Sequence, residues 1–117
     1  MAAQHEPHDE PLVPMPELTL PALRQAVAVV APARLPEFFE DMQKAFVQAG
    51  EDGSVAPIRM FYRQWGVNVE IARHPDVARR LSAAERAMDS ADAQTRERAV
   101  REIGDIVRAA HRAVAGG

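Results

Sequence analysis

Apolar residues recur every three or four positions through most of this 117-residue chain, and prolines divide them into separate segments. The first segment covers residues 20–30 and ends before Pro32, and the second covers residues 35–49. A third segment extends from Pro57 to about residue 73. No stretch alternates apolar and polar positions for long, as a half-buried strand would. The pattern therefore predicts a helix in each of the three segments.

Two further helices are predicted in the last third of the chain. One begins at Pro75, and the sequence DSAD at residues 89–92 then supplies side chains that can cap the helix after it. The final segment is the most regular, because Val100, Ile103 and Val107 follow one another at helical spacing. Its remaining faces carry charges of both signs, which is typical of a helix with one buried side.

We expect these helices to form a single all-α bundle over residues 18–115. Hydrophobic residues make up 47% of the chain and only six are aromatic, which favours close packing between helices. The apolar stripe of each helix predicts the core, and its main residues are Phe38, Phe39, Met42, Phe46, Phe61, Trp65, Val69, Leu81, Val100, Ile103 and Val107.

Residues 1–17 differ in composition from the rest of the chain. They contain four prolines and four acidic residues, and neither lysine nor arginine. The whole chain has a net charge of −3, so the remaining residues sum to +1. Because few apolar groups offset the entropy of ordering, we expect a disordered tail. The tail is either a solvated terminus or a segment whose charge binds a basic partner.

The predicted helix at residues 57–73 is apolar on two opposite faces. At about 100° per residue, its aromatic residues share one line, as a core stripe does. The opposite face carries a second apolar set bordered by two arginines, and this candidate interface comprises Met60, Val67, Ile71, Arg59 and Arg63. Either another layer of the bundle covers this face, or a second chain does, as a second copy or a different protein.

Two other binding functions remain open on the sequence alone. The basic region from Arg59 to Arg86 is rich in arginine, which is the electrostatic requirement for binding a nucleic acid. The other function is a ligand pocket between the second and third helices. Four aromatic residues would line that pocket: Phe38, Phe46, Phe61 and Trp65.

No pattern of residues indicates catalysis or a metal centre. The chain has no cysteine, which excludes disulfides, thiolate metal sites and cysteine nucleophiles. His5 and His8 form an HxxH pattern without a third ligand at fixed spacing, whereas zinc needs three or four ligands. The sequence contains no nucleophile elbow and no glycine-rich phosphate loop. We therefore expect a non-enzymatic protein without catalytic residues, metal or cofactor.

The runs LPALRQAVAVVAPARLPEFFEDMQKAF and APIRMFYRQWGVNVEIARHPDVARRL carry a resemblance to known proteins. The matching features are Leu35 and Pro36 at the start of an amphipathic helix, followed by Phe39 and Phe46, and then Trp65 in the next helix. In these features the chain resembles a family of small actinobacterial proteins of unknown function. Some members are similar in size and setting to antitoxins encoded beside ribonuclease-type toxins. The resemblance implies a helical, non-enzymatic protein that neutralises or regulates a basic partner.

The N-terminus has neither the basic start nor the apolar stretch of a signal peptide, and no apolar run approaches the roughly 20 residues of a membrane span. We therefore expect a cytoplasmic protein that does not bind membranes. Its predicted function is protein–protein interaction through a helical surface and the acidic tail, with a different protein or a second copy as partner. The alternative is a small regulator associated with nucleic acid.

Overall fold

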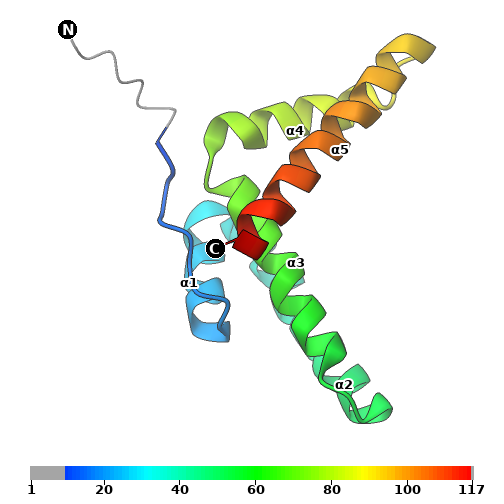
Figure 1. The fold of residues 1–117 in the computed structure, drawn as a ribbon. Helices are drawn as coiled ribbons and strands as arrows, with labels where there is room; N and C mark the ends of the chain where they lie inside the picture. Colours follow the sequence, from blue (N-terminus) through cyan, green and yellow to red (C-terminus); the bar gives the residue numbers. More distant parts are fainter. Residues whose placement is uncertain (1–9, 117) are drawn as a thin grey trace, which may run out of the picture. The chain divides into compact units, whose positions relative to one another are not determined.

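The computed structural model describes residues 10–116, and these residues contain five α-helices, one short 3-10 turn and no strand (Figure 1). In chain order the elements are α1 (Leu20–Val30), the turn Pro32–Arg34, α2 (Leu35–Asp52), α3 (Ala56–Ala72), α4 (Pro75–Ala87) and α5 (Ala93–Gly116). The prediction of an all-α fold with five helices is confirmed.

Local sequence signals set the ends of several helices. Thr19 caps α1, because its side chain accepts a hydrogen bond from a backbone N–H in the first turn at 3.4 Å. Asp92 caps α5, and its Oδ2 accepts hydrogen bonds from the backbone N–H of Thr95 at 2.9 Å and from the Thr95 hydroxyl at 2.7 Å. Gly53 ends α2 in the left-handed conformation, with a φ of 64° that glycine adopts without strain.

The helices group into two compact units. The N-terminal unit comprises residues 13–69, which include α1, α2 and most of α3. The C-terminal unit comprises the described residues 10–12 and 70–116, which include the last turn of α3 together with α4 and α5. The sequence predicted a single helical bundle domain over residues 18–115, and its extent as a domain stays a prediction.

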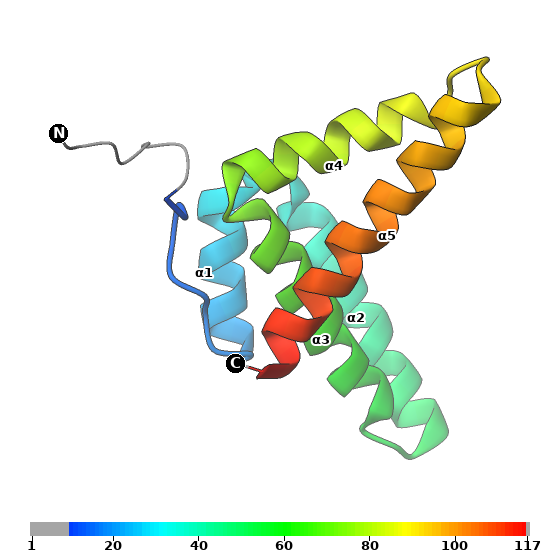
Figure 2. The same ribbon diagram turned by 45° about the horizontal axis from the view of Figure 1, so that its top comes forward.

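An aromatic cluster forms the core of the N-terminal unit. Within this unit α2 and α3 run antiparallel beside each other (Figure 2). The Phe38 ring lies 5.3 Å from the Phe61 ring and 5.2 Å from the Trp65 ring, the latter pair in an edge-to-face arrangement. The buried residues of this cluster, which include four that the sequence placed in the core, are Leu23, Ala26, Val27, Phe38, Phe61, Trp65 and Val69. Burying a valine, leucine or phenylalanine side chain of this cluster contributes about 1.5–3 kcal/mol.

The chain before α1 is ordered where the structure describes it. Met15 packs against the aromatic core, and Val13 and Pro16 are half-buried. The sequence predicted a disordered tail over residues 1–17, whereas Met15 within that range packs against the core. The prediction for residues 1–9 lies outside the described residues.

Small residues form most of the core of the C-terminal unit. In this unit α4 and α5 form a helical hairpin. The buried residues are Ile71, Ala84, Ala99, Ile106 and Ala110. Because alanine side chains are short, the backbones of the two helices can approach closely.

Two predictions for the core of this unit need correction. Val100, predicted to be buried, is 52% exposed, and Leu81, Ile103 and Val107 are only half-buried. The apolar arc of α5 is about 120° wide at 100° per residue. The packed edge of this arc is the one that carries the alanines, so the valines lie toward the solvent.

A similar correction applies to α2. Phe39 and Phe46 are 42% and 47% exposed, although the sequence placed both in the core, and Met42 is half-buried. Phe38 alone on this helix is fully covered, with an exposed fraction of 0%. The reason is again geometric, because the apolar arc of α2 is wider than the surface that its neighbours in the unit cover.

Candidate functional site

The predicted interface on α3 is largely closed. Val67 is 2% exposed and Ile71 is 8% exposed, so both are buried within this chain. Met60 is 70% exposed, and Arg59 and Arg63 are also exposed. Of the five candidate interface residues, Val67 and Ile71 are therefore covered by the chain itself, and Met60, Arg59 and Arg63 are exposed; binding of a partner at this face stays a prediction.

An open apolar strip on α2 offers a larger surface than the remainder of the α3 face. Its four residues follow at spacings of four, three and four positions: Leu35, Phe39, Met42 and Phe46. At 100° per residue they lie within about 60° of one another on the helix. The two phenylalanines expose nearly half of their area, and the other two residues are half-buried and touch the core. The sequence singled out three of these residues but assigned them to the interior.

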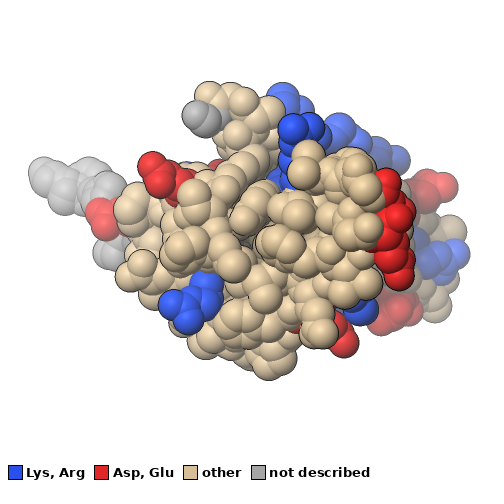
Figure 3. Space-filling model, turned by 90° about the horizontal axis from the view of Figure 1, so that it is seen from below, with Lys and Arg blue, Asp and Glu red and all other residues tan. Residues whose placement is uncertain are grey.

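Most of the exposed large hydrophobic residues belong to the N-terminal unit. Of ten such residues in the described part of the chain, seven lie between residues 13 and 69: Leu18, Val29, Phe39, Phe46, Val47, Val55 and Met60. Figure 3 shows one face on which residues other than Lys, Arg, Asp and Glu cover most of the area, with acidic and basic residues toward its edges. Exposed apolar area bordered by charge is typical of a surface that binds another protein.

A shallow groove of about 290 Å³ lies on the other side of the α2–α3 pair. Its lining residues are Asp41, Ala45, Pro57, Met60, Phe61, Gln64 and Trp65. Trp65 Nε1 donates a hydrogen bond to Asp41 Oδ2 at 3.1 Å, and the Arg34 guanidinium lies 4.8 Å from the Trp65 ring centre. The sequence predicted a ligand pocket lined by four aromatic residues. In the structure Phe38, Phe61 and Trp65 are packed in the core, and Phe46 is exposed.

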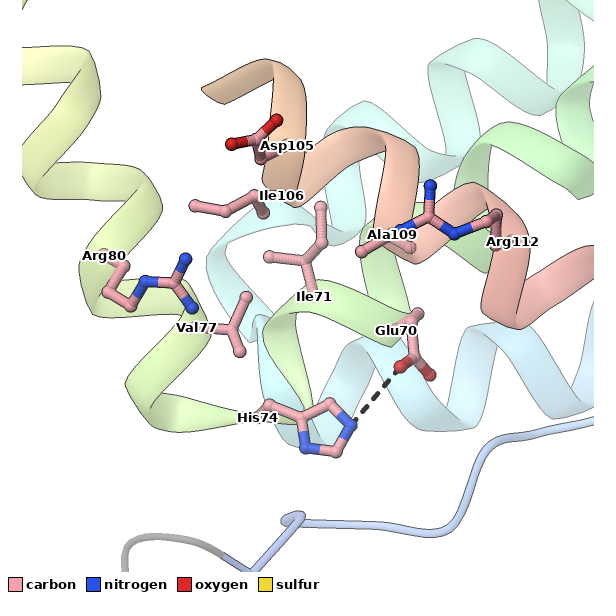
Figure 4. Close-up of a pocket in the computed structure, with 10 residues that line it drawn as sticks. Glu70, Ile71, His74, Val77, Arg80, Asp105, Ile106, Ala109 and Arg112 are labelled. Carbon is pink, nitrogen blue, oxygen red and sulfur yellow. Dashed lines mark ion pairs between the residues drawn. The ribbon is translucent and has the colours of Figure 1, made fainter. Parts of the chain in front are cut away.

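A second cavity, of about 390 Å³, lies in the C-terminal unit between the end of α3, α4 and α5. Its residues are Glu70, Ile71, His74, Val77, Arg80, Asp105, Ile106, Ala109, Ala110 and Arg112. Figure 4 shows Ile71, Val77 and Ile106 at its centre, with Arg80 and Arg112 on opposite sides. Sequence reasoning missed this cavity, because its residues come from three helices and no motif links them.

Most charged groups around this cavity are paired. Glu70 receives a salt bridge from Arg73 at 2.8 Å and contacts the His74 imidazole at 3.3 Å. Arg80 Nε donates to Glu102 at 2.9 Å, and this hydrogen bond raises the pKa of Arg80. On α5, Asp105 pairs with Arg108 at 2.7 Å.

Arg112 is the exception on the cavity rim. Within residues 10–116 it makes no hydrogen bond and no ion pair. Arg112 is exposed to solvent, and its guanidinium presents five N–H donors and a permanent charge beside the apolar cavity.

The basic region from Arg59 to Arg86 is divided between the two units. Arg59 and Arg63 belong to the N-terminal unit, and the other four arginines belong to the C-terminal unit. Of those four, Arg73 and Arg80 are committed to the salt bridges described above. Binding of a nucleic acid by this region stays a prediction.

Possible metal ligands do not cluster in the part of the chain that the structure describes. No group of three or more histidine, cysteine, aspartate or glutamate side chains in them could hold a metal ion. His5 and His8 lie outside the described residues. Asp41, which lines the groove beside Trp65, accepts its hydrogen bond from the Trp65 indole. None of the helices in residues 10–116 combines the length and the hydrophobicity that a membrane crossing requires.

No family model, curated protein or solved structure matches this chain. The resemblance to small actinobacterial proteins, with an antitoxin-like function, therefore stays a prediction from the sequence.

Proposed function

We propose that this chain is a non-enzymatic protein-interaction module that binds an amphipathic helix of a protein partner. The observation that carries the proposal is the open apolar strip on α2, formed by Leu35, Phe39, Met42 and Phe46. Exposing two phenylalanines on a regular helix is costly in water, and a covering helix would recover that free energy.

The spacing of the strip specifies the shape of its partner. Steps of four, three and four residues form the seam through which two helices pack side by side. From Leu35 to Phe46 the strip is about 17 Å long at 1.5 Å per residue. A partner helix of three or four turns, with apolar residues at the same spacing, would cover it.

The charge of α2 indicates which charge the contacting surface of the partner should carry. Residues 35–52 contain five acids, namely Glu37, Glu40, Asp41, Glu51 and Asp52, against the single cation Lys44, which gives a net charge of −4. Complementary charge accelerates association, so we expect a partner with basic residues beside its apolar seam.

The test replaces the two exposed phenylalanines by serine in the full chain, as Phe39→Ser with Phe46→Ser. The matched control is Val100→Ser, which removes an apolar side chain that is 52% exposed in the C-terminal unit. We expect a stoichiometric partner that co-purifies with the unchanged chain and the control to be lost from the double variant. Light scattering on the pure proteins reports whether the partner is a second copy.

Circular dichroism of the same variants separates binding from folding. Because both phenylalanines are nearly half exposed, the double variant should keep its helix content and melt close to the unchanged chain. A double variant that unfolds would show that the strip belongs to the core and overturn the proposal. A partner or dimer that survives the double substitution at unchanged affinity would do the same.

A further inference from the structure

We propose that the cavity between the end of α3, α4 and α5 binds a small monocarboxylic acid with an apolar body, and that Arg112 holds its carboxylate. This site lies within the C-terminal unit and shares no residue with the α2 strip, so it stands independently of the proposed function.

The size and the floor of the cavity favour an apolar ligand body. A volume of about 390 Å³ falls in the range of small-molecule sites. Its floor is aliphatic, formed by Ile71, Val77 and Ile106 with two alanines. None of these side chains donates or accepts hydrogen bonds, so the floor would discriminate by shape and hydrophobicity.

The unpaired cation decides the charge of the ligand. Arg112 lines the cavity and makes no contact with an acid among the described residues. A guanidinium and a carboxylate can form two parallel hydrogen bonds, which makes this pair stronger and more directional than a contact to a neutral group. A carboxylic acid with an apolar chain would place its carboxylate at Arg112 and its chain against the aliphatic floor.

The acids on the rim do not favour a cationic ligand instead. Glu70 is bound by Arg73 and His74, and Asp105 is bound by Arg108. A ligand cation would have to displace these pairs. The rim and its neighbours also carry equal numbers of the two charges. The arginines are at positions 73, 80, 108 and 112, and the acids are Glu70, Asp76, Glu102 and Asp105. The rim as a whole therefore favours neither an anionic nor a cationic ligand, and the preference for an anion comes from Arg112.

Octanoate and its neutral counterpart 1-octanol are the probes for this site, titrated into the ¹⁵N-labelled full chain and followed by NMR. We expect saturable shifts from octanoate at backbone amides of residues 70–80 and 105–112. Without a carboxylate, 1-octanol should bind at least about tenfold more weakly, as the loss of a charge-assisted hydrogen bond predicts.

Arg112→Gln removes the guanidinium charge, and Arg101→Gln is the matched control on an exposed position of α5 that does not line the cavity. We expect Arg112→Gln to weaken octanoate about tenfold or more while leaving 1-octanol unchanged, and the control to bind both as the unchanged chain does.

A second pair of variants tests the cavity itself. Ala109→Phe should fill it and abolish the shifts, whereas Ala113→Phe, on an exposed position outside the cavity, should not. The proposal is overturned if octanoate and 1-octanol bind alike, or if the shifts map to other residues. Equal octanoate binding by Arg112→Gln and the unchanged chain has the same consequence.

Discussion

The two units of this chain form their cores from different residues. All six aromatic residues lie between positions 38 and 65, in the N-terminal unit, and three of them are buried against one another. The C-terminal unit has no aromatic residue, and its buried side chains are alanines and isoleucines. The aromatic core therefore concentrates its stabilisation in a few large contacts. The small-residue core distributes it over close helix packing, a helix cap and surface ion pairs.

The largest expected effect is in the aromatic core. Trp65→Ala removes the ring that packs 5.2 Å from Phe38, together with the hydrogen bond to Asp41. We expect the free energy of unfolding to fall by about 3–5 kcal/mol, measured by chemical denaturation. Tyr62→Ala, on a neighbouring half-buried position, is the control and should cost less. Equal losses of unfolding free energy for the two variants would contradict the view that a few large buried contacts stabilise this unit.

The hairpin of α4 and α5 should lose stability when a buried side chain is enlarged, because its helices are closely packed. Ala99 is 4% exposed on α5, so Ala99→Leu forces extra methylene groups into a filled space. We expect a loss of about 1–3 kcal/mol in the same denaturation experiment. Ala113→Leu adds the same atoms on an exposed position of α5 and should leave stability almost unchanged. A tolerated leucine at position 99 would mean that the hairpin is loosely packed.

The cap of α5 should make the stability of the C-terminal unit depend on pH. The hydrogen bonds from Thr95 hold the pKa of Asp92 below its usual value. The carboxylate is thus favoured in the folded state, and its contribution is complete above the pKa of the unfolded chain, near pH 4. This contribution is lost as the pH falls through the lower pKa of the folded state.

Thermal melts of Asp92→Ala across pH 2–7 measure this contribution. The variant should be less stable than the unchanged chain at neutral pH, and the difference should shrink as the solution becomes more acidic. Asp89→Ala removes a carboxylate in the same connection that accepts no hydrogen bond from the described residues, and it serves as the control. A difference that is constant with pH would show that the charge of Asp92 does not support the helix.

The smallest expected effect is that of the ion pair between Arg80 on α4 and Glu102 on α5. Its nitrogen and oxygen lie 2.9 Å apart, but the two side chains are 53% and 38% exposed. Solvent screens such pairs, so a double-mutant cycle with Arg80→Gln and Glu102→Gln should give a coupling of about 0.2–1 kcal/mol. The coupling should fall further in high salt. A larger value would mean that the hairpin depends on charge more than on packing.

The sequence predicted the helices well because their signals are local. Proline at the first turns of α2 and α4, and the caps at Thr19 and Asp92, act through the backbone of their own segment. Such signals need no knowledge of distant residues. The sequence was less successful for the candidate site, since the exposure of Phe39 and Phe46 and the burial of Val67 depend on neighbouring helices.

The sequence by itself determined that the chain is helical and which arc of each helix is apolar. The tertiary structure alone decided which edge of that arc is covered. In α2 the covered edge carries Phe38, and in α5 it carries Ala99 and Ala110, which leaves Phe46 and Val100 in the solvent. The physical reason is that an apolar arc about 120° wide can pack through either edge, and the neighbouring helices select one. The cavity around Arg112 arises in the same way, because only the packing of three helices brings its residues together.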